Sequence, residues 1–263
     1  MSLCLLDISA LLRQNMTISG IAKQLQTNRS AVYDILHQNG ITDVRSYRIS
    51  QKFNQNFFDR IDTEEKAYWL GFLFADGNVF IKNKTYRVSI NIQKQDVGLL
   101  SKWHKSIGSC QNITFCGNMV RSIHHSQKMC EDLMKLGCGP RKSLVLKFPN
   151  LDSSLVKHFV RGYFDGDGCI SWHHNKNQNK GGIRISFIGT DMFLNHLQSD
   201  VFFALGSKHK KIQPVGNSRG AFSLTIGGYQ ESREITSWMY SGANVFLDRK
   251  YQKYLDLDKR MCA

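Results

Sequence analysis

The chain has 263 residues, enough for one large or two small folded units, and a hydrophobic content of 41% argues against an intrinsically disordered protein. No uncharged apolar run approaches membrane-spanning length, and the first residues lack the basic segment of a signal peptide. The 35 Lys and Arg residues against 21 Asp and Glu give a net charge of +14, which favours a polyanion such as nucleic acid as partner.

The seven cysteines form no CxxC pair, which argues against a zinc ribbon. They are interpreted as reduced thiols. The sequence therefore predicts a protein of a reducing, DNA-containing compartment, either the cytoplasm or an organelle matrix. It is expected to be neither secreted nor bound to a membrane.

Residues 1–41 have the pattern of a small helical segment. Apolar residues recur at helical spacing in "TISGIAKQL" and again in "SAVYDILHQNG", with the polar break "QTNR" between them. Two short helices around a tight turn resemble a helix-turn-helix, in which the front of the second helix reads base edges. That position is occupied by Asn28, Arg29, Ser30 and Tyr33. The alternative is a helical hairpin that only packs.

Residues 42–60 are polar and basic without a clean period, which predicts a linker or an arm that becomes ordered on an anionic surface. Two repeats follow, at residues 61–150 and 151–263, and each has the order αββαββα. The predicted fold class is therefore α+β, with two pseudo-symmetric units after the helical segment.

The predicted elements are marked by helical or alternating apolar patterns. In the first repeat these are a helix at 67–75, strands at 78–83 and 85–93, a helix at 97–108, strands at 110–115 and 118–126, and a helix at 129–137. In the second they are a helix at 155–166, strands at 169–174 and 183–189, a helix at 192–206, strands at 209–215 and 221–227, and a helix at 231–240.

The first helix of each repeat carries two small residues four positions apart: Gly71 and Ala75 in "YWLGFLFADG", and Gly162 and Gly166 in "FVRGYFDGDG". Positions i and i+4 lie on one face of a helix, and small residues there allow two helix backbones to approach closely. Glycine inside a helix costs about 1 kcal/mol relative to alanine, so these residues indicate a packing requirement. We expect the two helices to pack on each other.

Packing these helices together would bring Asp76 and Asp167 side by side at their C-terminal ends. Gly77 and Gly168 are expected to end the helices in left-handed geometry. Two carboxylates at negative helix ends repel each other, so a divalent metal with oxygen ligands is expected between them. An EF-hand is disfavoured because Lys176 would stand where the loop needs Glu. Buried structural aspartates remain the alternative.

The motifs "WLGFLFADG" and "VRGYFDGDG" resemble the paired signature of the LAGLIDADG homing endonucleases in their single-chain form, over about residues 57–257. The resemblance implies two sheets that form a saddle over the DNA major groove, and a staggered double-strand cut at a long target. It implies Asp76 and Asp167 as acidic metal ligands, assisted by the carbonyl groups of Ala75 and Gly166. The implied cofactor is Mg²⁺, as two or more divalent cations, with Mn²⁺ or Ca²⁺ as structural substitutes.

Further site residues are matched through the same resemblance. Gln93, with Lys94 beside it, matches a polar active-site position at a strand end, whereas the second repeat has Ile188 or Gly189 there, so the half-sites are expected to be unequal. A basic residue follows the last helix of each repeat. These two are Lys142 and Lys250, candidates for stabilising transition-state charge or perturbing the attacking water. The alternative role for each lysine is a phosphate contact or solubility.

Alternation along the strands predicts which side chains face DNA. The candidates are Asn78, Phe80, Lys82, Arg87, Ser89 and Asn91 in the first repeat and Ser171, His173, Arg184 and Ser186 in the second. A solvated outer face would show the same pattern.

The sequence as a whole predicts a monomeric, metal-dependent endonuclease that acts on double-stranded DNA. One alternative is a non-catalytic DNA-binding regulator on the same scaffold, although such a regulator is expected to lose the paired acids, and both are present. The other is an RNA maturase, which the charge does not distinguish from a DNA enzyme.

Overall fold

The computed structural model describes residues 4–13, 16–42, 53–175, 180–216 and 220–259. The chain divides into two compact units, one of residues 1–53 with 108–112 and the other of residues 54–107 with 113–263. Every helix in the described ranges is too short or too polar to cross a bilayer. Half of the predicted linker, residues 43–52, and Cys262 lie outside the described residues.

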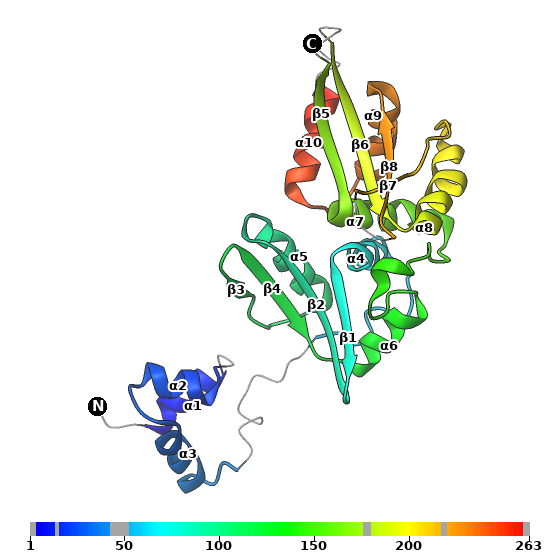
Figure 1. The fold of residues 1–263 in the computed structure, drawn as a ribbon. Helices are drawn as coiled ribbons and strands as arrows, with labels where there is room; N and C mark the ends of the chain where they lie inside the picture. Colours follow the sequence, from blue (N-terminus) through cyan, green and yellow to red (C-terminus); the bar gives the residue numbers. More distant parts are fainter. Residues whose placement is uncertain (1–3, 14–15, 43–52, 176–179, 217–219, 260–263) are drawn as a thin grey trace. The chain divides into compact units, whose positions relative to one another are not determined.

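In its described residues the N-terminal unit contains three helices, α1 (Leu5–Arg13), α2 (Ile18–Gln24) and α3 (Arg29–Gln38) (Figure 1). The Thr17 hydroxyl accepts the Gly20 amide at 3.1 Å to cap α2, and the Asn28 side chain accepts the Ala31 amide at 2.8 Å to cap α3. Ile8, Leu12, Ile21, Val32 and Leu36 are fully buried and form its core. The predicted helices on either side of "QTNR" are therefore present.

The first repeat begins with α4 (Glu64–Ala75) and builds a four-stranded antiparallel sheet in the order β1-β2-β4-β3. Its strands are β1 (Gly77–Lys82), β2 (Thr85–Gln93), β3 (Thr114–Cys116) and β4 (Met119–His124). The helices α5 (Val97–Ile107) and α6 (Gln127–Lys135) pack on one face of this sheet. That face supplies the core, with Val88, Ile90, Ile92 and Val120 buried.

The second repeat has the same sheet topology, β5-β6-β8-β7, after α7 (Ser153–Asp167). Its strands are β5 (Gly168–Asn175), β6 (Lys180–Gly189), β7 (Gln213–Pro214) and β8 (Phe222–Gly227), and its later helices are α8 (Asp191–His196), α9 (Tyr229–Tyr240) and α10 (Asp248–Lys259). The mixed α+β class with two antiparallel sheets is therefore confirmed.

Some predicted elements differ from the structure in the second repeat. The predicted helix at 192–206 ends as α8 at His196 and continues as a π-helical turn, Leu197–Phe202, and a 3₁₀ turn, Phe203–Leu205. The Ser199 hydroxyl donates to the Asn195 carbonyl at 2.9 Å, a side-chain bond that competes with the helical ladder. The predicted strand at 209–215 shortens to Gln213–Pro214, where proline lacks an amide for further pairing. Helix α10 was not predicted.

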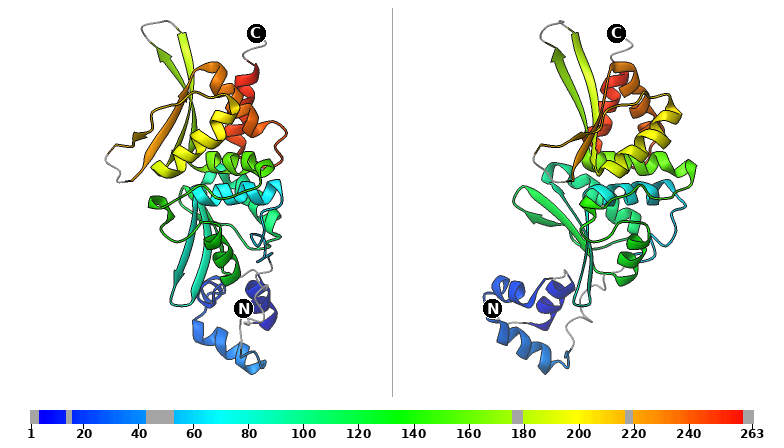
Figure 2. Two further views of the ribbon diagram at one scale, coloured as in Figure 1. Left: turned by 90° about the vertical axis from the view of Figure 1, so that its right-hand side faces the viewer. Right: turned by 45° about the vertical axis from the view of Figure 1, so that its right-hand side comes forward.

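Helices α4 and α7 cross in direct contact between the two sheets (Figures 1 and 2). A Cβ atom added at Gly71 would lie 2.0 Å from the Phe159 carbonyl oxygen, and one at Gly162 would lie 1.9 Å from that of Tyr68. Neither position can hold a side chain unless the helices separate. The predicted packing of the two motif helices is therefore confirmed.

The glycines that follow the two helices have a different role from the predicted one. Gly168 has φ −90° and ψ 163°, and Gly77 is absent from the residues with positive φ. A Cβ at Gly77 would lie 2.6 Å from the Leu73 carbonyl oxygen, and one at Gly168 would lie 2.1 Å from the Phe164 ring. The prediction of left-handed glycines was wrong. Glycine is required here because the chain turns from helix into strand directly against the last helical turn.

Candidate functional site

The two motif acids meet at the C-terminal ends of the crossed helices. Asp76 is the C-cap residue of α4, and Asp167 is the last residue of α7. A Cβ atom added at Gly166 would lie 2.3 Å from the Ala75 Cβ and 3.5 Å from the Asp76 Oδ2. The small residues Ala75 and Gly166 therefore allow the helix ends, and with them the acids, to come together.

The acids are held in an environment that disfavours their charge. Burial raises the pKa of Asp76 above its ordinary value. Burial also raises the pKa of Asp167, and the negative charge of Asp76 adds to this effect, so that the pKa reaches about 6. The positive charges of Lys142 and Lys250 act in the opposite direction on both carboxyl groups. The pair is therefore short of positive charge.

The two predicted basic residues lie at the helix ends that carry the acids, where each amine donates to backbone carbonyl groups. Lys142 Nζ lies 2.5 Å from the Gly77 carbonyl oxygen and 3.4 Å from that of Ala75. Lys250 Nζ donates to the carbonyl oxygens of Phe164, Asp165, Gly166 and Gly168 at 2.5, 2.8, 3.4 and 2.6 Å.

Both lysines are more than nine-tenths buried. Burial lowers the pKa of Lys250 to about 8. The structure thus gives them a positioning role, since they hold the helix ends that carry the acids. Their predicted role in transition-state stabilisation stays a prediction.

A third motif acid, Asp165, is a buried structural aspartate. Its carboxylate accepts hydrogen bonds from the hydroxyls of Tyr68 at 2.8 Å and Tyr240 at 2.5 Å, and from the Leu247 amide at 2.7 Å. Its pKa is raised by burial. The structural alternative for the motif acids thus applies to Asp165, which ties α4, α7 and α9 to the start of α10.

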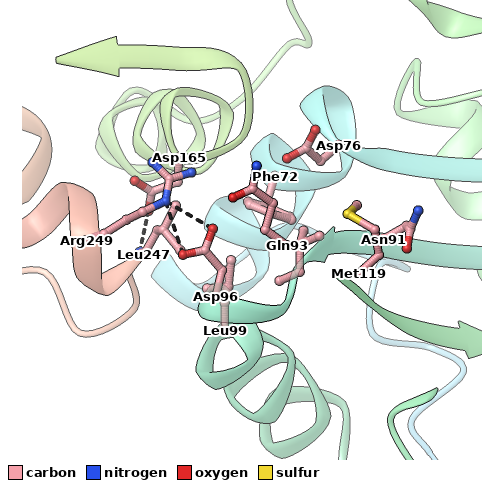
Figure 3. A pocket seen from close by; sticks show the side chains of 11 residues that line it. Phe72, Asp76, Asn91, Gln93, Asp96, Leu99, Met119, Asp165, Leu247 and Arg249 are labelled. Carbon is pink, nitrogen blue, oxygen red and sulfur yellow. Dashed lines mark hydrogen bonds and ion pairs between the residues drawn. The ribbon is translucent and has the colours of Figure 1, made fainter. Parts of the chain in front are cut away.

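A pocket of about 210 Å³ opens beside Asp76. Figure 3 shows Asp76, Asn91 and Gln93 around it, together with an ion pair between Asp96 and Arg249. Arg249 Nε lies 3.1 Å from Asp96 Oδ1 and 3.0 Å from Asp96 Oδ2. The pair joins the turn after β2 to the first turn of α10, so the strand end that carries Gln93 is fixed to the second repeat.

The strand registers correct the predicted counterpart of Gln93. Gly77 lies opposite Ile90 on β2, and Gly168 lies opposite Phe187 on β6. Counting from these anchors, the counterpart of Gln93 is Thr190, and Ile188 corresponds to Asn91. The prediction of Ile188 or Gly189 was wrong because it counted along the motif without knowing the strand pairing. In this register the DNA-facing candidates Arg87 and Arg184 occupy equivalent positions, and so do Ser89 and Ser186.

The open face of the first sheet carries the predicted polar residues. Asn78 lies opposite Ser89, and Phe80 lies opposite Arg87, whose guanidinium stacks 4.7 Å from the Phe80 ring centroid. Asn78, Lys82, Asn91 and Gln93 are exposed on this face, whereas Ser89 is largely buried. The predicted Lys94 is also exposed but lies beyond the strand, in the turn Lys94–Asp96. The register adds Arg121, opposite Asn91, and Thr114 beyond it, which sequence reasoning missed. The alternation along "MVRSIH" would have predicted Arg121 on this face.

The second sheet has an equivalent face. Ser171 lies opposite Arg184, Cys169 opposite Ser186, and Thr225 follows on β8. The backbone of His173 pairs with Gly182, but its side chain lies outside the described residues. In the N-terminal unit, Arg29 and Ser30 are exposed at the start of α3, whereas Tyr33 is partly buried against the core.

No protein-family model matches the chain. Over 171 residues it is 23% identical to an uncharacterized protein, MJ0398, of Methanocaldococcus jannaschii, a match that covers 62% of this chain and 59% of that protein. The chain thus spans less than two thirds of this relative.

Solved structures share the fold. The LAGLIDADG homing endonuclease I-SmaMI bound to cleaved DNA has a TM-score of 0.55 and 13% identity, over 76% of this chain and 88% of that chain. I-GzeII in complex with its DNA target has a TM-score of 0.55 and 12% identity, over 73% and 88%. I-AabMI bound to uncleaved DNA has a TM-score of 0.52 and 11% identity, over 73% and 88%. The fold is that of the LAGLIDADG homing endonucleases.

Proposed function

We propose that this protein is a site-specific endonuclease that hydrolyses both strands of a DNA target at Asp76 and Asp167. The observation that carries the proposal is the meeting of these two acids at the ends of crossed helices, between two sheets with polar and basic open faces. The net charge of +14 favours a polyanionic substrate. The structural neighbours named as endonucleases in complex with DNA support the same substrate.

The residues at the site suit a divalent cation such as Mg²⁺. Asp76 and Asp167 offer carboxylate oxygens in a place short of positive charge, and the carbonyl oxygens of Ala75 and Gly166 adjoin them. Among the described residues no group of three or more His, Cys, Asp or Glu side chains could hold a metal. Phosphate and water oxygens would therefore complete the coordination. When bound, the metal supplies positive charge at the phosphate and lowers the pKa of water.

The remaining residues position the reactants. Lys142 and Lys250 hold the helix-end carbonyls, so the two acids keep a fixed separation while DNA binds. Gln93 stands at the strand end and lines the same pocket as Asp76, so the proposal assigns it a hydrogen bond to a water at the phosphate. Each repeat thus presents one acid, and the proposal assigns one DNA strand to each.

The experiment uses a pool of DNA with randomised sequence, incubated with the protein and Mg²⁺, from which cut ends are sequenced to find the target. Asp76→Asn and Asp167→Asn should each abolish double-strand cutting of that target while DNA binding survives. Asp256→Asn, an exposed position on α10, is the matched control and should cut normally. Wild-type protein that binds DNA but never cuts it would support the regulator instead, and selective binding of RNA would support the maturase.

We propose further that residues 1–41 form a helix-turn-helix that makes a second DNA contact, with the exposed Arg29 and Ser30 at its front. Deleting residues 1–41 should weaken binding and shorten the DNA footprint, while the cut position stays unchanged. An unchanged footprint and affinity would mean that this unit does not contact the target.

A further inference from the structure

An exposed apolar tip lies in the segment that joins the two repeats. Leu144 and Val145 are 66% and 71% exposed, and only Ser143 separates them from the buried Lys142. Two adjacent apolar side chains of this exposure disfavour contact with water and gain free energy when a partner covers them. We call these two residues the apolar tip.

The tip is held at both of its ends. On one side, the amine of Lys142 donates to backbone carbonyl groups at the end of α4. On the other, Leu146 is 4% exposed, and its carbonyl accepts the hydroxyl of Thr190 at 2.5 Å, at the start of α8. Between these anchors lies one 3₁₀ turn, Lys142–Leu144, which the Val145 amide closes on the Lys142 carbonyl at 3.0 Å. The exposure of the tip is therefore built into the fold.

The tip lies at the end of the second sheet that carries an acid. A Cβ atom added at Gly220 would lie 3.0 Å from Leu144 Cδ2. Gly220 comes just before β8, and β8 begins opposite Gly189, the last residue of β6. The same end of β6 pairs with Gly168, which directly follows Asp167. The tip thus adjoins the Asp167 half-site, while its anchor Lys142 holds the helix end of Asp76.

The charges beside the tip indicate what covers it. Arg141 and Lys147 are exposed on its two sides. An apolar pair between two cations suits a partner with an apolar interior and an anionic rim. DNA has this chemistry, since its stacked base pairs lie between two rows of phosphates. A second copy of this chain, with its own net charge of +14, lacks the complementary rim.

The first half-site has polar residues at the corresponding positions. Counting from the two buried lysines, Leu144 and Val145 correspond to Gln252 and Lys253 on α10. Gln252 Nε2 donates to Asp256 Oδ1 at 3.1 Å, and Lys253 Nζ donates to the Ile170 carbonyl at 3.0 Å. The apolar tip therefore belongs to one side of the acid pair.

We propose that Leu144 and Val145 form a wedge that enters the DNA minor groove beside the acids and unstacks one base step. With the open sheet faces in the major groove on both sides, the minor groove faces the acids, because the two grooves alternate about every 5 bp along B-DNA. Apolar side chains that enter this groove part neighbouring base pairs and bend the duplex. Arg141 and Lys147 bind phosphates on the two sides of the wedge. The inference rests on the DNA binding of the proposed function.

The test uses DNA recovered by binding from a pool of randomised sequence, so it does not depend on cutting. 2-Aminopurine, a base analogue whose fluorescence rises on unstacking, replaces the central bases in turn, with Ca²⁺ in place of Mg²⁺. Wild-type protein should raise the fluorescence at one step. Leu144→Ser with Val145→Ser should abolish that rise and weaken affinity by roughly tenfold to a hundredfold, the loss of two apolar contacts less the cost of unstacking. Leu144→Met with Val145→Ile keeps the apolar volume and should behave as the wild type.

Further variants separate the wedge from general effects. Met134→Ser is the matched control, because Met134 is 48% exposed on α6, on the covered side of the first sheet. Arg141→Gln and Lys147→Gln should each reduce the slope of log affinity against log salt by roughly one, as loss of one phosphate contact does. Since all of these side chains are exposed, the melting temperature should stay unchanged.

The outcomes distinguish this inference from the proposed function. Stacked 2-aminopurine at every central step, or an equal rise with the double serine variant, would overturn the wedge and leave the endonuclease intact. A wild-type dimer that the double serine variant dissociates would assign the tip to a second copy, and would also overturn it. A protein that binds and unstacks this DNA but never cuts it would overturn the proposed endonuclease and leave the wedge standing.

Discussion

The crossing of α4 and α7 makes a testable prediction about stability. In Gly71→Ala the new methyl would lie 2.0 Å from the Phe159 carbonyl oxygen and 2.9 Å from the Tyr163 amide nitrogen. Carbon–oxygen contacts lie at about 3.3 Å or more, so the helices must separate by roughly 1.3 Å. Backbone atoms cannot rotate away as a side chain can.

The magnitude follows from two opposing terms. Overpacking of a well-packed interior costs about 1–3 kcal/mol and sometimes more, whereas alanine gains about 1 kcal/mol over glycine inside a helix. Because the whole helix pair must move, we place the overpacking cost at the upper end of its range, about 2–4 kcal/mol, which leaves a net loss of about 1–3 kcal/mol. For a unit of this size that corresponds to a fall in melting temperature of roughly 2–10 °C.

Gly98→Ala is the matched control, since Gly98 lies inside α5 and its added Cβ would meet only Asp248 Oδ2, at an ordinary 3.6 Å. It should stabilise the protein by up to about 1 kcal/mol. Urea unfolding followed by the fluorescence of the buried Trp69 and Trp103 measures both effects. The double variant of Gly71 and Gly162 should lose less than the sum of the single losses, because one separation of the helices accommodates both methyl groups.

If Gly71→Ala proves as stable as Gly98→Ala, the helices are not in backbone contact at that point, and the account of how the two acids meet would be wrong. An additive double variant would contradict the shared crossing alone.

Three further predictions concern charge and buried hydrogen bonds. Asp167→Asn should raise the melting temperature at pH 8, because the pKa of Asp167 in the folded protein, about 6, lies above its ordinary value of 3.8, so its charge destabilises the fold there. The gain should shrink as the pH falls through 6. It should vanish below pH 3.8, where the carboxyl group is protonated in both the folded and the unfolded protein. Burial lowers the pKa of His124 from 6.5 to about 3, so between these values the unfolded protein binds a proton that the folded protein does not. The free energy of unfolding should therefore fall as the pH drops below 6.5, by about 2 kcal/mol at pH 5. His124→Gln should flatten a plot of melting temperature against pH. Lys250→Met should lower the free energy of unfolding in urea by about 1–3 kcal/mol. The loss should exceed that of Lys142→Met, since Lys142 donates to fewer carbonyl groups. A larger loss for Lys142→Met would contradict the role of Lys250 in holding the end of α7.

The sequence by itself determined those features that depend on local spacing. The separation of Gly71 from Ala75, and of Gly162 from Gly166, predicted a helix crossing because residues four apart share a helix face. The same crossing required Asp76 and Asp167 to meet. Alternation along "TYRVSINIQ" separated the covered face of β2 from its open face, since successive side chains of a strand point to opposite sides.

Only the tertiary structure decided what depends on partners distant in the chain. Three aspartates stand in the two motifs, and nothing local distinguishes Asp165, which becomes structural because Tyr68 and Tyr240 reach it from other helices. Thr190 is identified as the counterpart of Gln93 only when the paired strands of the two sheets are compared. Its hydroxyl donates to the carbonyl of Leu146, which belongs to the first repeat. Periodicity fixes which way a side chain points. The atom that it meets is set by how separate helices and sheets pack, which no single stretch of sequence encodes.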